Sequence, residues 1–436
     1  MNQIQAEDIF CSRTVRLLAV FLCLFLFAEF AVPPHVRANN SQFSKTAEPL
    51  FQREITFGMS ADFTGTARAL SAEFYIGAQS YFAHINNSGG INGTKVRLLA
   101  YDDGYNPKPT IDNTIQLVEQ EKVFALFGYV GTPTVSRILP LLRKYASRNL
   151  YLLFPVTGAE ALRQPPYDKY VYCLRGSYRD ETRALVDRLV SLGHRRIAVF
   201  YQADAFGRSG WDGVRRALAA HGLNVVGAAA YRRGEVVEKQ YAREVELIRS
   251  SRPDAIISVG VAEASAGLIR DARKCGLDVP YGFLSFTNGD ELVRLLKEHA
   301  NLPETGSNLR MIFSQIVPSF RDTRLPAVNE YVQLVNKYKK IVRLPYGLDR
   351  GWFQPYSFAG FEGYLSARAL CAMLEEMGEP YTPSRIPEAM NAICTDELGL
   401  NNKFSLCTNS GKQVYFTVYK DGSILPEEHW EEWRKK

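Results

Sequence analysis

The feature that most constrains this chain is a regular alternation of short apolar runs and amphipathic segments, which begins at Ile55. A first series of apolar runs covers 55–59, 96–101, 123–127 and 150–154, and a second covers 197–201, 225–230, 255–259 and 281–286. Segments with helical spacing lie between these runs, at 71–86, 109–121, from 133 on, 180–192, 207–221, 238–250 and 262–275. Strands that alternate with helices in this way form parallel sheets with right-handed crossovers. The sequence therefore predicts an α/β protein with two doubly wound parallel-sheet lobes.

The last third of the chain departs from this alternation. One more strand is predicted at 311–317, followed by helices at 325–338, 355–377 and 384–393, and by closing strands near 403–405 and 413–418. The whole chain has 436 residues, which is too long for one ordinary core. Both observations agree with two lobes that share the chain.

The strongest candidate for a ligand site is the glycine turn after the third strand. Residues 128–134 are Gly-Tyr-Val-Gly-Thr-Pro-Thr, and Pro133 suits the first turn of a helix with Thr132 as its N-cap. Free N–H groups and hydroxyls at a helix N-terminus hold anionic groups. The alternative is that Gly131 only supplies a tight turn and Thr132 only caps a helix. The turn alone does not decide between these interpretations.

Other strand ends carry small hydroxyls and aromatic rings. Ligands of open parallel sheets bind beyond the carboxyl ends of the strands. These ends are predicted at 61–66, 129–132 and 156–158 in the first lobe, and at 201–207, 261–262 and 286–289 in the second. Hydroxyls on one lobe that face aromatic rings on the other form a cleft suited to a small polar or amphipathic solute.

No motif for catalysis, cofactor or metal binding stands out. The sequence has no nucleophile elbow, phosphate-binding Walker loop, paired CxxC or dinucleotide fingerprint, and its six histidines are scattered. Asp102-Asp103-Gly104 resembles the start of a calcium loop but lacks a Glu at the required spacing. The net charge of +6 comes from scattered residues, without the basic stripe of a nucleic-acid binder. We expect no catalysis, no cofactor, no metal and no nucleic-acid partner.

The N-terminus has the pattern of an export signal. Arg13 and Arg16 precede an apolar run at 17–28, and Val36-Arg37-Ala38 offers a small-residue cleavage site. We expect a signal peptide at 1–38, a disordered leader at 39–52 and a periplasmic or secreted protein, with an uncleaved signal anchor as the alternative. Beyond the signal, Cys394 and Cys407 either form a disulfide in an oxidising compartment or remain free thiols.

An ordered set of short motifs resembles the periplasmic leucine/isoleucine/valine-type solute-binding family, the extracytoplasmic receptors of ABC importers. The resemblance runs from about residue 54 to 423. The motifs are Ile76-Gly77-Ala78, Asn86-Asn87-Ser88-Gly89-Gly90-Ile91-Asn92-Gly93, Tyr101-Asp102-Asp103-Gly104-Tyr105-Asn106-Pro107, Gly131-Thr132-Pro133-Thr134, the run from Phe154 to Arg163, Tyr178-Arg179-Asp180-Glu181-Thr182, and Phe206-Gly207.

The resemblance implies a type I periplasmic binding protein, in which two lobes joined by three hinge crossovers close on a ligand. The crossovers are expected near 175–178, 308–311 and 398–403. The implied lobes are 53–176 plus 310–398 for the N-terminal lobe, and 177–309 plus 399–436 for the C-terminal lobe. The implied partners are a small-molecule ligand, which is an amino acid, an amide or an aromatic or aliphatic carboxylate, and either an ABC permease or a membrane sensor.

The resemblance also implies which residues form the site. A hydroxyl at Thr132 and the backbone around Val156 to Gly158 hold a ligand carboxylate, while aromatic rings press on it from the cleft. The ligand-binding residues expected are Tyr129, Gly131, Thr132, Val156, Thr157, Gly158, Tyr178, Phe206 and Phe286.

Two positions differ from the branched-chain amino acid receptors that the chain resembles. Those receptors usually carry a Tyr at the position of Val261 and an acidic residue near Phe286-Thr287, which together receive the α-ammonium group. Here both positions are apolar or neutral, and a buried ammonium without an anionic partner is strongly disfavoured. The expected ligand is therefore a carboxylate without an α-amine, an aromatic acid, an amide or an amino acid bound differently. Asp62, Asp180 and Asp204 are alternative sources of charge.

Overall fold

The structure is a computed structural model that describes residues 53–301, 309–393, 398–400 and 413–426. The predicted signal peptide and leader, the Cys394–Cys407 pairing and the predicted strand near 403–405 lie outside the described residues. Among the described residues, no helix has the length and apolar character needed to cross a membrane.

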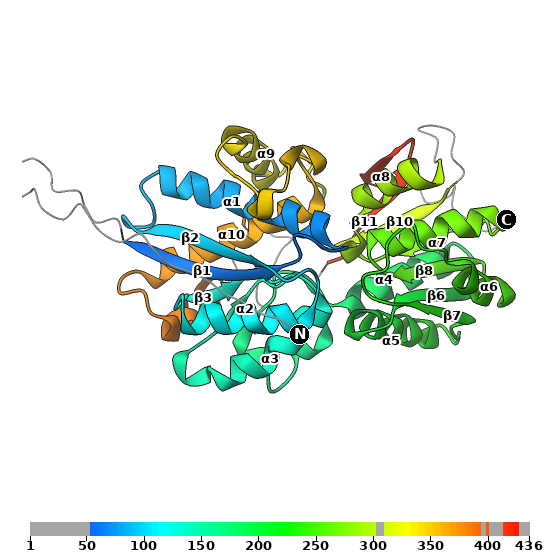
Figure 1. Cartoon of the computed structure of the whole chain (residues 1–436), viewed down its shortest axis with the longest axis horizontal. Helices are drawn as coiled ribbons and strands as arrows, with labels where there is room; N and C mark the ends of the chain where they lie inside the picture. Colours follow the sequence, from blue (N-terminus) through cyan, green and yellow to red (C-terminus); the bar gives the residue numbers. More distant parts are fainter. Residues whose placement is uncertain (1–52, 302–308, 394–397, 401–412, 427–436) are drawn as a thin grey trace, which may run out of the picture. The chain divides into compact units, whose positions relative to one another are not determined.

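The first lobe is built on a five-stranded, all-parallel sheet with strand order β2-β1-β3-β4-β5. Its strands are β1 (Glu54–Ala61), β2 (Lys95–Asp102), β3 (Ala125–Phe127), β4 (Leu152–Leu153) and β5 (Val171–Tyr172). Its helices are α1 (Arg68–Asn87), α2 (Pro107–Glu119), α3 (Thr132–Lys144), α9 (Pro326–Tyr338), α10 (Phe358–Met377) and α11 (Ile386–Ala392). Helices α1, α9 and α10 lie on one face of this sheet, and α2 and α3 on the other (Figure 1).

The second lobe is built on a seven-stranded sheet with strand order β12-β11-β10-β9-β8-β6-β7. Strands β6 (Ile197–Gln202), β7 (Gly227–Tyr231), β8 (Ala255–Val259), β9 (Tyr281–Phe283) and β10 (Met311–Gln315) are parallel, whereas β11 (Tyr415–Lys420) and β12 (Ser423–Pro426) are antiparallel additions at one edge. The helices are α4 (Tyr178–Ser191), α5 (Ala205–Ala220), α6 (Ala242–Ser250), α7 (Ala262–Lys274) and α8 (Gly289–Ala300).

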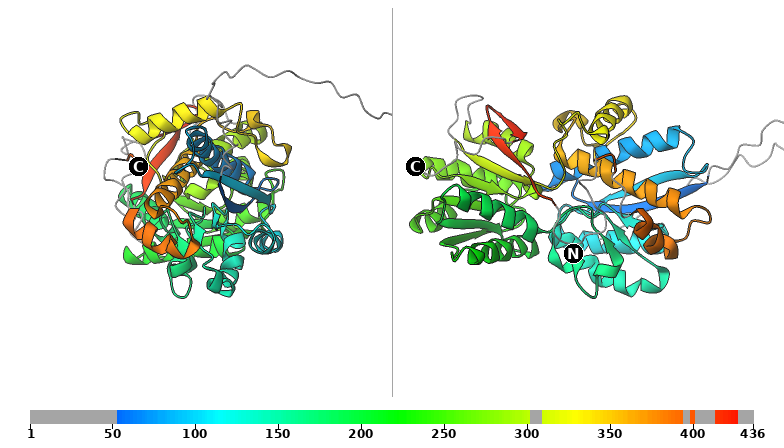
Figure 2. Two further views of the ribbon diagram at one scale, coloured as in Figure 1. Left: turned by 90° about the vertical axis from the view of Figure 1, so that its left-hand side faces the viewer. Right: turned by 180° about the vertical axis from the view of Figure 1, so that it is seen from behind.

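Both sheets reverse their direction of winding at one strand, as doubly wound sheets do. The first lobe runs outward from β1 to β2 and then back to β3, and the second runs from β6 to β7 and then back to β8. Right-handed crossovers then place helices on opposite faces of each sheet, as the views from the side and from behind show (Figure 2). The reversal leaves a crevice beyond the carboxyl ends of the strands.

The predicted α/β architecture is confirmed, with differences at a few elements. The sequence analysis did not identify β5, α8 or β12. The strand predicted at 281–286 ends at Phe283, because Ser285–Thr287 form the 3₁₀ helix η4. Further 3₁₀ helices lie at Ala146–Arg148, Glu160–Arg163, Asp168–Tyr170, Pro345–Gly347, Arg350–Trp352 and Pro383–Arg385.

One predicted lobe boundary needs correction. Residues from 310 on were assigned to the N-terminal lobe, but β10 pairs with β9 and β11 in the second sheet. The chain returns to the first lobe after β10, because α9 and α10 both pack against α1. The second crossover therefore follows β10 and does not precede it.

Candidate ligand-binding site

The candidate site lies where strand ends of the first lobe meet helix starts of the second. The turn after β3 contributes Thr132, and the segment after β4 contributes Thr157. The second lobe contributes Tyr178 from the start of α4, Phe206 from the start of α5 and Phe286 from η4. All five residues are buried to within 1% of complete burial.

Three hydroxyl groups form a chain at the centre of the site. The Thr132 hydroxyl lies 2.7 Å from that of Thr157 and 3.1 Å from that of Tyr178. Each hydroxyl can donate one proton and accept others, so the three groups can serve one another or a ligand. The Thr157 hydroxyl also accepts the N–H of Ala159 at 3.2 Å, which satisfies part of its acceptor capacity.

The start of α3 differs in register from the prediction. Its N-cap is Gly131, and Thr132 is the first residue of the helix, so the prediction of Thr132 as N-cap was wrong by one residue. Thr134 donates its hydroxyl back to the carbonyl groups of Val130 and Gly131. No side chain caps this helix. The Thr132 hydroxyl is thus released from capping. Pro133 has no N–H and the Val135 N–H is donated to the Gly131 carbonyl at 2.9 Å, so the N–H groups of Thr132 and Thr134 are the ones that this helix start offers to an outside acceptor.

Two glycines make room for the aromatic rings of the site. Gly131 has a φ of 102°, and a Cβ atom there would lie 2.5 Å from Cε2 of Tyr105. A Cβ atom at Gly158 would lie 2.6 Å from Cδ1 of Tyr178. Val156 joins the two segments through its backbone, since its carbonyl accepts the Gly131 N–H at 3.2 Å. A side chain at either glycine would displace a ring of the site.

Four aromatic rings form a continuous series from one lobe to the other. Tyr178 and Phe206 have ring centroids 5.2 Å apart, and Phe206 and Phe286 are 4.9 Å apart. Phe286 stacks at 6.1 Å on Tyr105, which belongs to the first lobe. These separations lie within the range of favourable aromatic contacts. The aromatic series therefore begins at the hydroxyl chain and crosses the cleft.

Tyr129 joins the site through its backbone but not through its ring, because its carbonyl accepts the N–H of Val156 at 2.8 Å. Its ring belongs to the core between the first sheet and helices α2 and α3, together with Leu117 and Leu142. Its hydroxyl lies 3.1 Å from that of Thr114 on α2. Side chains alternate along an extended segment, so this ring points to the opposite side from the turn that carries Thr132.

The structure adds three residues that the prediction did not include. Gln202 donates its Nε2 group to the Tyr105 hydroxyl across the lobes at 3.3 Å. Tyr231 donates its hydroxyl to Oε1 of Gln202 at 3.0 Å and accepts the N–H of Val261 at 3.0 Å. Gln202 is the last residue of β6, and this position at a strand end could have identified it as a site residue from the sequence. Tyr105 has a φ of 57° after Gly104, and no sequence pattern predicts where such a residue directs its ring.

A buried ion pair lies beside the site. Arg175, on the segment before α4, forms a bidentate pair with Glu362 of α10, at 2.8 and 2.6 Å. Burial alone would lower the pKa of Arg175, but the neighbouring Glu362 carboxylate raises it above its ordinary value. Burial raises the pKa of Tyr178, and the charge of Arg175 opposes that shift. The Glu181 carboxylate acts in the same direction as burial, so the raised pKa of Tyr178 keeps its hydroxyl protonated.

A small hollow adjoins the aromatic series between the lobes. It is lined by Thr66, Ala67, Ala69, Leu70, Val261, Ala262, Phe286, Thr287, Asn288 and Glu291, and its volume is about 10 Å³. That volume suits about one water molecule. Most of the lining is apolar, and Val261 and Thr287 are the two positions where an ammonium-binding group was expected to be missing.

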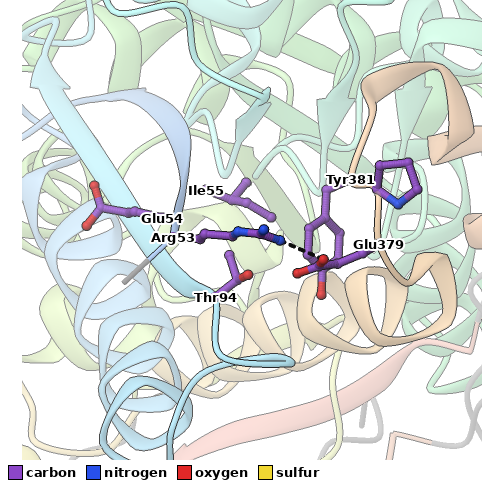
Figure 3. A pocket seen from close by; sticks show the side chains of 7 residues that line it. Arg53, Glu54, Ile55, Thr94, Glu379 and Tyr381 are labelled. Atoms are coloured by element: carbon purple, nitrogen blue, oxygen red, sulfur yellow. Dashed lines mark hydrogen bonds and ion pairs between the residues drawn. The ribbon is translucent and has the colours of Figure 1, made fainter. Parts of the chain in front are cut away.

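A larger hollow of about 490 Å³ lies at the opposite end of β1 (Figure 3). Arg53 and Glu379 form an ion pair of 2.6 Å in it, beside Thr94 and Tyr381. Both charged side chains are largely exposed, so this hollow is open to solvent. It lies at the amino ends of the strands, away from the switch-point crevice. Among the residues that the structure describes, no group of His, Cys, Asp and Glu side chains is arranged to hold a metal ion.

Comparison with known proteins shows the family of the chain. Residues 54–422 match the family described as periplasmic binding protein. The chain is 26% identical over 228 residues to an amino acid binding protein of Pseudomonas aeruginosa, which covers 51% of this chain and 58% of that protein. It is 27% identical over 211 residues to the Leu/Ile/Val-binding protein BraC3 of Rhizobium johnstonii, covering 48% and 55%. These matches span little more than half of the relatives' own lengths.

A solved structure extends the similarity to nearly the whole chain. The crystal structure of a possible leucine/isoleucine/valine-binding protein from Rhodopirellula baltica SH 1 is similar with a TM-score of 0.76 and 28% identity. The similarity covers 89% of this chain and 100% of that one. Both lobes therefore have counterparts in a solved protein.

Proposed function

Because the chain belongs to the periplasmic binding protein family, we propose that it is the extracytoplasmic solute-binding receptor of an ABC importer. It captures a small amino-acid-like or carboxylate ligand between two closing lobes and delivers it to a permease. The protein binds its solute without transforming it. A ligand-sensing module for a membrane signalling protein is the second candidate, since it would use the same closure.

The observation that carries this proposal is the hydroxyl chain of Thr132, Thr157 and Tyr178 at the start of the aromatic series. One end of the site is polar, with the hydroxyls of Thr132 and Thr157 from the first lobe and of Tyr178 from the second, and the other end is aromatic. A small solute with a polar head and an apolar body satisfies both walls at once. The expected ligand contacts are those of the predicted residues, without the side chain of Tyr129 and with Tyr105 and Gln202 added.

The burial of the site supports a hinge mechanism. A solute reaches residues that are almost completely buried only when the lobes separate. Several contacts between the lobes are polar: Gln202 with Tyr105, Asn288 Nδ2 with Glu73 at 3.0 Å, and Arg68 with Glu263 at 3.5 Å. Polar contacts of this kind can exchange with water when the lobes separate. Ligand binding then shifts the population toward the closed form.

Export follows from the N-terminal pattern and belongs to the proposal. A receptor of this class acts outside the cytoplasmic membrane, and the signal expected at 1–38 would bring it there. N-terminal sequencing of the protein from its native host tests this part. A mature chain that begins near residue 39 is the expected result, and retention of residues 1–38 would favour the signal anchor.

The decisive experiment identifies the solute. We expect mass spectrometry of protein purified from its native host to find one small molecule at stoichiometric amount, which is released on unfolding. The same molecule should bind again in calorimetry and remain chemically intact after long incubation. Failure to bind any member of a broad panel of amino acids, amides and carboxylates would contradict the proposal. Co-purification with a membrane sensor and not with a permease would favour the second candidate.

A further inference from the structure

We infer that closing of the lobes takes up one proton at Glu73, so that the receptor binds its solute more weakly as pH rises. The inference rests on the proposed function, because it concerns the lobe closure on which solute capture depends. It comes from a buried acid of the first lobe whose surroundings change when the second lobe moves against it.

Glu73 lies on α1 at a contact between the two lobes. Its carboxylate accepts Nδ2 of Asn288, at the start of α8 in the second lobe, at 3.0 Å. The Asn288 side chain is held in place, because its Oδ1 atom accepts the Glu291 N–H and so caps α8. Glu73 is only 3% exposed, so the closed form removes its carboxyl group almost completely from water.

The first lobe by itself supplies partners that favour the ionised carboxylate. The N–H of Gln354 is donated to Oε1 of Glu73 at 3.4 Å, and a hydrogen bond from Ser357 lowers the pKa of Glu73. Both residues belong to the segment that leads into α10, and α10 packs against α1, so they stay with Glu73 when the lobes separate. An open cleft also returns water to this carboxyl group. In the open form we therefore expect its pKa to lie in the ordinary range of a glutamate.

The second lobe changes these surroundings in the opposite sense. It completes the burial of Glu73 and brings Asp290 and Glu291, two acids of the first turn of α8, toward it. Burial is the largest cause of a pKa raised to about 8, and the charges of both acids add to the rise. The Asn288 amide opposes this shift without cancelling it. The positive end of the α8 dipole would favour an anion, but the two acids already lie there.

The cations of this region act on the neighbouring acids. Arg294 donates Nε and Nη2 to the Glu291 carboxylate at 2.7 Å, and Arg321 opposes the rise that burial causes in the pKa of Asp290. Tyr331 of α9 also lies near Glu73, and burial keeps its hydroxyl protonated. The two charges that act on the pKa of Glu73 are therefore both negative.

The difference between the open and closed forms links closure to a proton. Between the two pKa values, Glu73 is ionised in the open form and protonated in the closed form, so closing takes up close to one proton. The stabilisation of the closed form by this proton is fully present below the open-form pKa and is lost as pH rises through the closed-form pKa. Because the solute binds the closed form, its affinity follows the same dependence.

Calorimetry at two pH values tests the inference. The probe is whichever compound binds most tightly among leucine, phenylalanine, benzoate, 3-phenylpropanoate and acetamide, which do not titrate between about pH 6 and about pH 7.5. We expect the affinity of the wild type to fall by roughly tenfold over this range. In two buffers of different ionisation heat, binding near neutral pH should take up close to one proton. Absence of proton uptake, or an affinity that rises with pH, would overturn the inference.

A matched pair of variants assigns the proton to Glu73. Glu73→Gln keeps an uncharged acceptor and removes the titration, so its affinity should change by less than about twofold over the same range. Glu330→Gln is the control, because Glu330 accepts the Tyr364 hydroxyl and Arg368 at 2.6 Å inside the first lobe. It should keep the pH dependence of the wild type. Equal pH dependence in Glu73→Gln and the wild type would overturn the inference and leave solute capture intact. Failure of these probes and of the broader panel at both pH values would instead contradict the proposed function.

Discussion

Two buried polar clusters lie on either side of Tyr178, and they are built in opposite ways. We call Arg175, Glu362, Glu181 and Ser285 the hinge cluster. Arg175 donates to Glu362 and lies 3.4 Å from the Ser285 hydroxyl, while Glu181 accepts the N–H of Ser285 and the hydroxyl of Ser314. The hydroxyl chain, in contrast, contains no formal charge.

We infer from this difference that the hinge cluster connects the lobes and that the hydroxyl chain binds the solute. A buried ion pair is rigid and depends strongly on both partners, so it suits a fixed point between elements of two lobes. Neutral hydroxyls have a small desolvation cost and rotate to suit a partner, so they suit a site that is alternately filled and emptied. We therefore expect mutations in the hinge cluster to change stability first, and mutations in the hydroxyl chain to change affinity first.

The largest effect is expected for Arg175→Met. It leaves the carboxylates of Glu362 and Glu181 buried without a cation, which should lower the free energy of unfolding by about 3–5 kcal/mol. Urea or guanidinium unfolding followed by circular dichroism measures it.

The matched control for this variant is Arg216→Met. Arg216 pairs with Asp212 at 2.6 Å on an exposed helix surface, where such a pair contributes about 0–1 kcal/mol. Equal losses in the two variants would show that the hinge cluster has no special role in stability.

The second prediction concerns the hydroxyl chain itself. Thr132→Val keeps the shape of the side chain and removes the hydroxyl at the centre of the hydroxyl chain, so affinity for the solute should fall by ~1–3 kcal/mol. Calorimetry with the solute identified from the native protein measures the change, and the free energy of unfolding should change less than the affinity does.

Thr114→Val is the control for this prediction. Thr114 also places its hydroxyl 3.1 Å from a tyrosine hydroxyl, that of Tyr129, but in the core of the first lobe. It should lose a similar amount of stability and no affinity. If both threonine variants bind the solute as well as the wild type does, the Thr132 hydroxyl is a structural group only.

The two clusters also show which features could be predicted from the sequence and which could not. Strands and helices followed from periodicity, and Thr132, Thr157, Tyr178, Phe206 and Phe286 do lie together. The local sequence pattern could not assign β10 to the second lobe, because its pairing with β9 depends on contacts outside the strand itself.

The misplaced ring and the missed residues have the same physical origin. Tyr129 was expected in the site because of its position in the turn, but the direction of one side chain depends on register at a strand end. The Tyr105–Gln202 bond joins residues far apart in the chain, and the Arg175–Glu362 pair joins residues still further apart. Contacts of this kind have no signature in a single sequence.

The third prediction concerns the pH dependence of stability that comes from Glu73, whose carboxylate accepts Nδ2 of Asn288 from the other lobe. The groups around Glu73 are Asp290 and Glu291 on α8, Asn288, Ser357 and Tyr331. With a folded-state pKa of about 8 against an ordinary value of 4.5, the folded protein retains a proton that the unfolded chain has lost. Stability from this group is therefore lost as pH rises through the folded pKa.

Glu73→Gln removes this dependence and keeps an acceptor for Asn288. Between about pH 6.5 and about pH 7.5, the variant should gain about 1 kcal/mol of stability relative to the wild type. Urea unfolding of both proteins across this range provides the measurement. A wild type that gains stability over the variant as pH rises would mean that Glu73 is ionised and paired in the folded protein.

The smallest effect is expected for the bond that closes the cleft, between Gln202 and Tyr105. Tyr105→Phe removes the acceptor at 3.3 Å and keeps the ring stacked on Phe286, while Gln202 keeps its bonds to Asp204 and Tyr231. Since the bond is long and one partner stays satisfied, affinity should fall by roughly two- to threefold.

Tyr101→Phe is the control, because Gln116 donates to the Tyr101 hydroxyl at 3.2 Å within a single lobe. A loss of affinity in the Tyr105 variant but not in the Tyr101 variant assigns the effect to closure across the lobes, and equal affinities in the two would show that the aromatic series closes the cleft without the bond.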